Sequence, residues 1–124
     1  MPQIIIVALF GLLGIFSRWS LDSIAGKWFE LFPIGILGIN IIGSFLAGIT
    51  YVAGTEKTIL PAHLAIGLLV GFCGGFTTFS AYSLQSVLYI QKADMVRGIG
   101  YLCLSPALGF LGALLGINLS RSLL

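Results

Sequence analysis

The chain has 124 residues, of which 58% are hydrophobic and only 8% are charged. A soluble domain of this size cannot bury so much apolar surface, so the composition predicts an integral membrane protein with a single domain, residues 1–124. Six basic and four acidic residues give a net charge of +2, which is too small to indicate nucleic-acid binding.

Four apolar segments are long enough to cross a lipid bilayer, because a spanning helix needs about 20 residues. They run from about residue 2 to 21, 31 to 53, 59 to 90 and 98 to 120. The acidic residues fall in the loops or at segment ends, and none is expected inside a span. The segments therefore predict an all-α membrane protein with four transmembrane helices.

The third segment is too long for one straight helix across the bilayer. At 1.5 Å per residue, residues 59–90 would extend about 48 Å, whereas the hydrocarbon layer is about 30 Å thick. Its middle reads GFCGGFTTFSAYS, from Gly71 to Ser83. Unwinding at Gly74 and Gly75 would release carbonyls that a cation can satisfy, and would create a helix N-terminus that favours an anion. We therefore expect a break in mid-membrane, with a simple kink as the alternative.

The basic residues of the loops give only a weak preference for one orientation in the membrane. Lys27, Lys92 and Arg97 would lie on one side, and Lys57 and Arg121 on the other. Such a weak bias permits insertion in both orientations and hence an antiparallel dimer. A single four-helix bundle also has little room for a pore, which favours an oligomer if the protein conducts a solute.

Small residues recur every four positions on three of the spans. Such stripes let helix backbones approach closely, but the spacing does not say whether the partner helix belongs to the same chain. The stripes are Gly67, Gly71 and Gly75; Asn40, Ser44 and Gly48; and Ser105, Gly109 and Ala113.

The polar groups expected inside the membrane are neutral hydrogen-bond donors. Donors without acidic neighbours favour an anion over a cation, and the electropositive edge of an aromatic ring such as Phe79 can join them. Arg18, late in the first span, either reaches the interface or draws anions into a vestibule. No nucleophile–base pair, phosphate loop or metal-ligand spacing is present, so enzyme activity is not expected. The donors are Asn40, Thr77, Thr78, Ser80, Ser83, Ser105, Tyr82 and Tyr101.

With these features the chain resembles the Fluc (CrcB) family of fluoride channels over nearly its whole length. The resemblance is carried by the arginine of the first span, GINIIGSFLAG in the second and GFCGGFTTFSAYS in the third. It implies an antiparallel, dual-topology homodimer in the cell inner (plasma) membrane, with two pores that export cytoplasmic fluoride passively. It also implies a structural Na⁺ on the dimer axis, held by backbone carbonyls of Gly74 and Thr77.

The resemblance further implies a role for each matching residue. Asn40, Phe79, Ser80 and Tyr82 match pore positions, and Arg18 matches a vestibule arginine. The remaining residues of the predicted fluoride path are Thr78, Ser105 and Tyr101.

Three positions depart from the family pattern and keep alternatives open. Tyr82 stands where a second phenylalanine is expected, Ala81 where threonine is common, and Gln85 where many members carry glutamate. One alternative is therefore a subunit of a heteromeric fluoride channel, paired with a paralogous chain. Another is a small dual-topology, proton-coupled exporter of cationic drugs, which would need a carboxylate embedded in the membrane.

Overall fold

The computed structural model describes residues 1–28 and 34–124, and this part of the chain is helical without a strand. Four stretches are long and apolar enough to cross a membrane, which confirms the predicted spans: Gln3–Gly26, Ile34–Glu56, Ala62–Gln91 and Met95–Leu123. The second span's predicted start, residue 31, lies outside the described residues. The elements are α1 (Gln3–Trp28), α2 (Ile34–Tyr51), the π-helical η1 (Val52–Glu56), α3 (Ala62–Ile66), the π-helical η2 (Gly67–Cys73), α4 (Gly74–Phe76), α5 (Phe79–Gln91) and α6 (Met95–Leu123).

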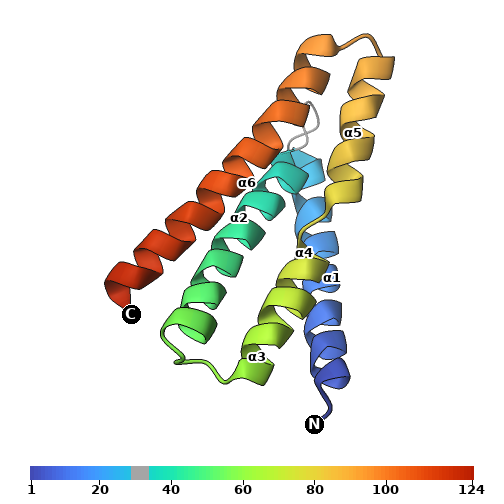
Figure 1. The fold of residues 1–124 in the computed structure, drawn as a ribbon. Coiled ribbons are helices and arrows are strands. Elements are labelled where there is room, and N and C mark those ends of the chain that lie inside the picture. Colours follow the sequence, from blue (N-terminus) through green and yellow to red (C-terminus); the bar gives the residue numbers. More distant parts are fainter. Residues whose placement is uncertain (29–33) are drawn as a thin grey trace.

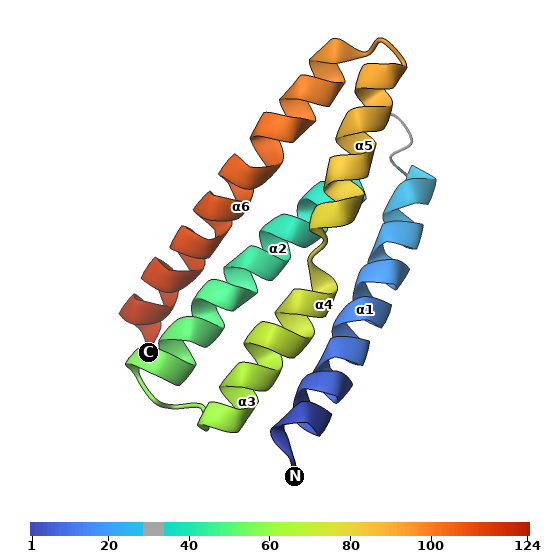
Figure 2. The same cartoon turned by 45° about the vertical axis from the view of Figure 1, so that its right-hand side comes forward.

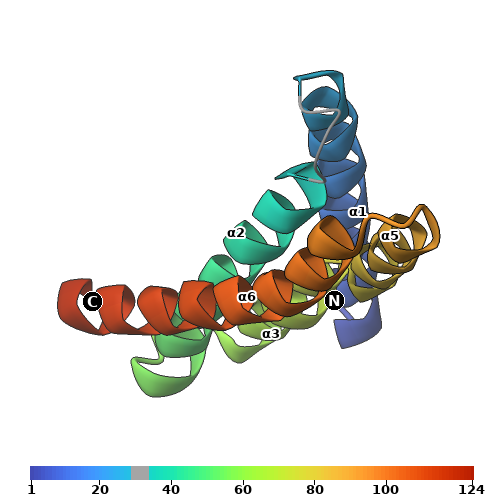
Figure 3. The same cartoon turned by 90° about the horizontal axis from the view of Figure 1, so that it is seen from above.

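The spans pack in two main pairs. Helix α2 lies along α6, and α1 lies along η2 and α4, while α5 leans on the first half of α6 (Figures 1 and 2). The N- and C-termini emerge at the same end of the molecule, as an even number of spans requires (Figure 1). Viewed from above, α1 and α6 point in clearly different directions, so the four spans form an open bundle (Figure 3).

Glycines allow the third span to pack directly on the backbone of α1. A Cβ added at Gly71 would lie 2.6 Å from the carbonyl oxygen of Val7, and one at Gly75 would lie 2.6 Å from that of Gly11. Real Cβ atoms do not approach this closely, so any side chain here would separate the two helices. For this stripe the partner helix, which the spacing alone left open, is α1 of the same chain.

The third span changes direction at Thr77 and Thr78, which form an extended two-residue link between α4 and α5 (Figure 2). Thr77 has φ −79° and ψ 155°, and Thr78 has φ −144° and ψ 113°. Gly74 is helical, with φ −63° and ψ −37°, and Gly75 also lies in α4. The prediction that the chain unwinds at Gly74 and Gly75 is therefore wrong, because Gly75 serves the contact with α1 instead.

Helix α1 continues beyond its predicted end at residue 21. It includes Asp22, which lies inside the span Gln3–Gly26 and is half-buried. A Cβ added at Gly35 of α2 would lie 2.8 Å from the Asp22 carboxylate. The prediction that no acidic residue lies within a span is thus wrong for Asp22. A charged residue does not end a helix whose backbone bonds are all internal, so the end of an apolar run is not the end of the helix.

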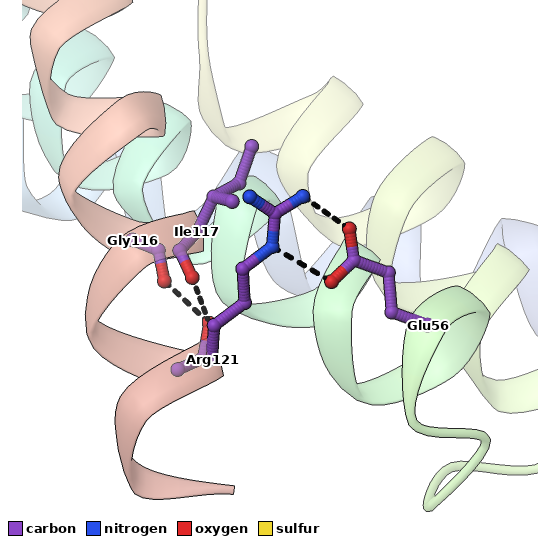
Figure 4. A network of polar contacts seen from close by, with 5 residues as sticks. Glu56, Gly116, Ile117 and Arg121 are labelled. Carbon is purple, nitrogen blue, oxygen red and sulfur yellow. Dashed lines mark hydrogen bonds and ion pairs between the residues drawn. The ribbon is translucent and has the colours of Figure 1, made fainter.

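An ion pair joins the ends of the second and fourth spans. Arg121 donates from Nε to Glu56 Oε2 at 2.8 Å and from Nη2 to Oε1 (Figure 4). This bidentate pair fastens η1 to the last turns of α6.

Candidate functional site

A cavity of about 290 Å³ lies beside the Thr77–Thr78 link, between α2, α5 and α6. Every side chain in its lining is neutral, and five of the lining residues are predicted members of the fluoride path. Thr77, predicted as a hydroxyl donor and as a carbonyl ligand of Na⁺, also lines it. The full lining is Asn40, Ser44, Thr77, Thr78, Phe79, Tyr82, Ser105, Pro106, Gly109 and Phe110.

Asn40 on α2 holds the link through both polar atoms of its side chain. Its Oδ1 accepts a hydrogen bond from the Thr78 amide at 2.8 Å, and its Nδ2 donates to the Thr78 carbonyl at 3.2 Å. An amide nitrogen carries two hydrogens, so one N–H of Asn40 is not used by Thr78. The clamp on the backbone is a role that the sequence reasoning missed.

The two threonines differ in what their hydroxyls do. The Thr77 hydroxyl donates to the Cys73 carbonyl at 2.8 Å, one turn back along its own helix. Thr78 is the N-cap of α5, where its Oγ1 accepts from the Ala81 amide at 3.3 Å and lies 3.5 Å from Ser80 Oγ. Threonine is among the residues preferred at this position, so the sequence itself favours a helix start here. The Thr78 oxygen accepts in this cap, which leaves its hydroxyl hydrogen able to donate.

Arg18 contacts the same region from α1. Its Nε donates to the carbonyl of Gly75 at 3.2 Å, and the contact is partly buried. In a continuous helix this carbonyl would accept from the amide four residues later, that of Phe79. Arg18 therefore donates to the Gly75 carbonyl in place of the helical amide. It does not line the cavity, so the predicted vestibule role remains a prediction.

Three aromatic rings are stacked edge to face from the cavity inward. The centroids of Phe79 and Tyr82 lie 5.6 Å apart at 63°, and those of Tyr82 and Tyr101 lie 5.5 Å apart at 65°. Phe79 is 80% exposed, Tyr82 is buried, and Tyr101 is completely buried. Tyr101 lies behind Tyr82 and is not part of the lining.

The hydroxyl of Tyr82 is bonded to the backbone of α6. It donates to the carbonyl of Leu102 on α6 at 2.7 Å. The sequence analysis identified this hydroxyl as a candidate donor in the fluoride path, and here it is engaged with the backbone.

Two further residues of the lining, Ser44 and Gly109, come from the packing faces of α2 and α6. Ser44 and Gly109 were expected only to pack helices, and a Cβ added at Gly109 would lie 3.4 Å from Ser44 Oγ. Ser44 lies one turn after Asn40, a spacing that could have identified it. Phe110 is 69% exposed, and nothing in the sequence separates it from other apolar residues of α6.

The lining can hold a small anion better than a cation. It holds an amide N–H and hydroxyls, which can donate to an anion, and the ring of Phe79, whose edge is electropositive. Among residues 1–28 and 34–124, no group of three His, Cys, Asp or Glu side chains could hold a metal ion.

Comparison with known proteins shows similarity over nearly the whole chain. The family described as CrcB-like protein, Camphor Resistance (CrcB), matches residues 5–117. The chain is 36% identical over 125 residues to the fluoride-specific ion channel FluC of Syntrophotalea carbinolica, covering 98% of this chain and 99% of that protein. It is 34% identical over 127 residues to the FluC of Geobacter sulfurreducens, covering 99% of this chain and all of that protein. With its four spans, the chain is a multi-pass membrane protein.

Proposed function

Because the chain belongs to the CrcB-like family, we propose that it is a fluoride channel. The observation that carries the proposal is the neutral cavity beside the Thr77–Thr78 link, in which donors and a ring edge converge without an acidic neighbour. The channel lets cytoplasmic fluoride leave passively through the inner (plasma) membrane.

In this mechanism fluoride exchanges its water for donors of the chain. The N–H of Asn40 that Thr78 does not use, the hydroxyls of Thr78 and Ser105, and the edge of Phe79 receive it in turn. Fixed donors suit a small, strongly hydrated anion, because the backbone clamp prevents Asn40 from rotating. Ser80, next to Phe79, extends the path beyond the cavity, and Arg18 attracts anions to its entrance.

We further propose that two copies assemble antiparallel, with the link in mid-membrane. In the single chain the link is flanked by exposed residues, namely Gly74, Phe79 and Ser80. Phe79 is the most exposed of the aromatic side chains near the cavity, at 80%. A second copy would cover this face and complete each pore.

The carbonyls of Gly74 and Thr77 suit a structural Na⁺ at the centre of such a dimer. The amide that would serve Gly74 in a continuous helix belongs to Thr78 and goes to Asn40. The amide that would serve Thr77 belongs to Ala81 and goes to the Thr78 hydroxyl. Both oxygens therefore lack their helical donor, and carbonyl oxygens are ligands that hard cations prefer. The ion's positive charge would lower the electrostatic cost of anions nearby.

Efflux from liposomes tests the function. The chain is purified alone, reconstituted in vesicles loaded with fluoride or chloride, and followed with an ion-selective electrode. We expect rapid fluoride release and little chloride release. Equal release of both anions would contradict the selectivity, whereas flux that appears only with a paralogous chain would identify a heteromeric channel.

Asp22 favours a second candidate, a proton-coupled exporter of cationic compounds. Such an exporter needs a carboxylate within the membrane, and Asp22 lies half-buried inside the first span. It is not part of the cavity lining. Uptake of a lipophilic cation into vesicles on a proton gradient, abolished by Asp22→Asn, would support this candidate. Fluoride efflux retained in Asp22→Asn would support the channel.

A further inference from the structure

Helix α6 contains a proline in its interior, where each residue ordinarily donates a backbone N–H to the helix. The helix runs without interruption from Met95 to Leu123 and includes Pro106. Proline has no backbone N–H, so the carbonyl of Leu102, four residues earlier, loses its helical donor. In a membrane-spanning segment such a carbonyl needs another partner, because water is not present to replace the lost bond.

Tyr82 supplies that partner from α5. Its hydroxyl donates to the Leu102 carbonyl at 2.7 Å, which is an ordinary distance for a good hydrogen bond of this kind. The tyrosine side chain is 7% exposed, so few water molecules compete for the carbonyl. A phenylalanine at position 82 would fill the same space but leave the carbonyl without this donor.

The bond also fixes the position of the Tyr82 ring. The ring is held at its hydroxyl end by α6 and meets Phe79 on one side and Tyr101 on the other. Because Tyr82 and Pro106 both line the cavity, the carbonyl bond between their helices determines how this wall is shaped.

We infer that Tyr82 is a positioning residue paired with Pro106, and that its hydroxyl is not an anion ligand. Pro106 frees the Leu102 carbonyl, Tyr82 binds it, and the Tyr82 ring then orients Phe79 at the cavity. The phenolic hydrogen donated to Leu102 is not available to an anion. The expected effect on fluoride permeation rests on the proposed channel function. The structural pairing of Tyr82 with Pro106 does not.

A double-mutant cycle tests the pairing directly. The four proteins are the wild type, Tyr82→Phe, Pro106→Ala and the double variant. In Pro106→Ala the new alanine N–H can serve Leu102, so the tyrosine hydroxyl becomes dispensable. Leu102 can be observed alone by solid-state NMR, because Leu102–Cys103 is the only Leu–Cys pair in the sequence. Labelling leucine carbonyls with ¹³C and cysteine amides with ¹⁵N therefore selects one signal.

We expect Tyr82→Phe to move the Leu102 carbonyl signal upfield in the proline background, and to leave it in place in the alanine background. Fluoride efflux should fall about fivefold on Tyr82→Phe with Pro106 present, the effect of one lost hydrogen bond, and less than about twofold with alanine there. Tyr51→Phe, which removes an exposed hydroxyl at the end of α2, is the control and should change neither measurement.

Two outcomes would overturn the inference. One is a Leu102 signal that does not respond to Tyr82→Phe in the proline background. The other is an equal fold-loss of efflux in both backgrounds, which would mean that the hydroxyl acts on the anion itself. If the wild type shows no fluoride efflux, the proposed function fails, and the NMR cycle still decides the pairing.

Discussion

Asn40 and Thr78 lie 38 positions apart in the chain, yet they exchange two hydrogen bonds as neighbouring residues of two strands would. The side-chain amide of Asn40 makes the two hydrogen bonds that the backbone of a neighbouring strand would make. It thereby satisfies the Thr78 amide and adds a side-chain donor to the Thr78 carbonyl, which is the first acceptor of α5. The extended link is thus fixed from α2 rather than by its own sequence, and several predictions about the cavity depend on this clamp.

Asn40→Asp should suppress fluoride efflux and lower the stability of the protein. The carboxylate can still accept from the Thr78 amide, but it faces the Thr78 carbonyl without a hydrogen to donate and adds a negative charge to the cavity. We expect a loss of about 1–3 kcal/mol in the free energy of unfolding, measured by denaturation in detergent, with the proposed dimer retained. Asn118→Asp, on α6 and outside the cavity lining, is the matched control and should retain fluoride efflux.

Arg18→Lys should be nearly as harmful as Arg18→Gln. Lysine keeps the positive charge but loses the guanidinium Nε that reaches Gly75 at 3.2 Å. We expect both variants to melt at lower temperature and to conduct fluoride more slowly. A lysine variant with normal efflux would show instead that the charge, and not the bond to Gly75, is what matters at this position.

Phe79→Ile should reduce fluoride efflux without lowering the melting temperature of the single chain. The ring contributes its edge to the cavity, but it is 80% exposed and buries little surface within its own chain. Phe16→Ile provides the control, because Phe16 is also exposed, at 61%, but lies on α1 away from the cavity. Equal efflux from the two variants would remove Phe79 from the proposed path.

Gly75→Ala should be strongly destabilising, whereas Gly100→Ala should not. The new Cβ at position 75 would lie 2.6 Å from the Gly11 carbonyl, and nothing lies within 4 Å of one at position 100. Overpacking of this kind costs about 1–3 kcal/mol, while alanine in an open helical position is about 1 kcal/mol better than glycine. The measurement is the midpoint of unfolding in detergent. Similar midpoints for the two variants would show that α1 can move away from α4.

Hydrophobicity alone predicted the four spans, because each is a long apolar run with charges near its ends. The length of the third segment and its glycine pair predicted the irregular part at Gly74 and Gly75, three residues before the extended threonines. Glycine is permitted to leave a helix, but here Gly75 is needed for contact with α1, a requirement that depends on another helix. The sequence pattern does not show whether a glycine interrupts its helix or allows close contact with another helix.

The polar contacts of the candidate site were predictable as residue types but not as partners. Asn40 and Arg18 were identified as candidates for an anion path, whereas their bonds to Thr78 and Gly75 depend on how three helices meet. Of these three contacts, the bond from Tyr82 to Leu102 was the hardest to predict from the sequence. It requires knowing both that Pro106 frees a carbonyl and that α5 lies against α6 at that height.

Two carbonyls near the site lose their helical donor and gain a side-chain partner, and each partner lies earlier in the chain. Arg18 precedes Gly75, and Tyr82 precedes Leu102. Proteins are synthesised from the N-terminus, so every donor has left the ribosome before the acceptor that needs it. When the chain is inserted into a bilayer span by span, the donors for these two carbonyls are therefore already present.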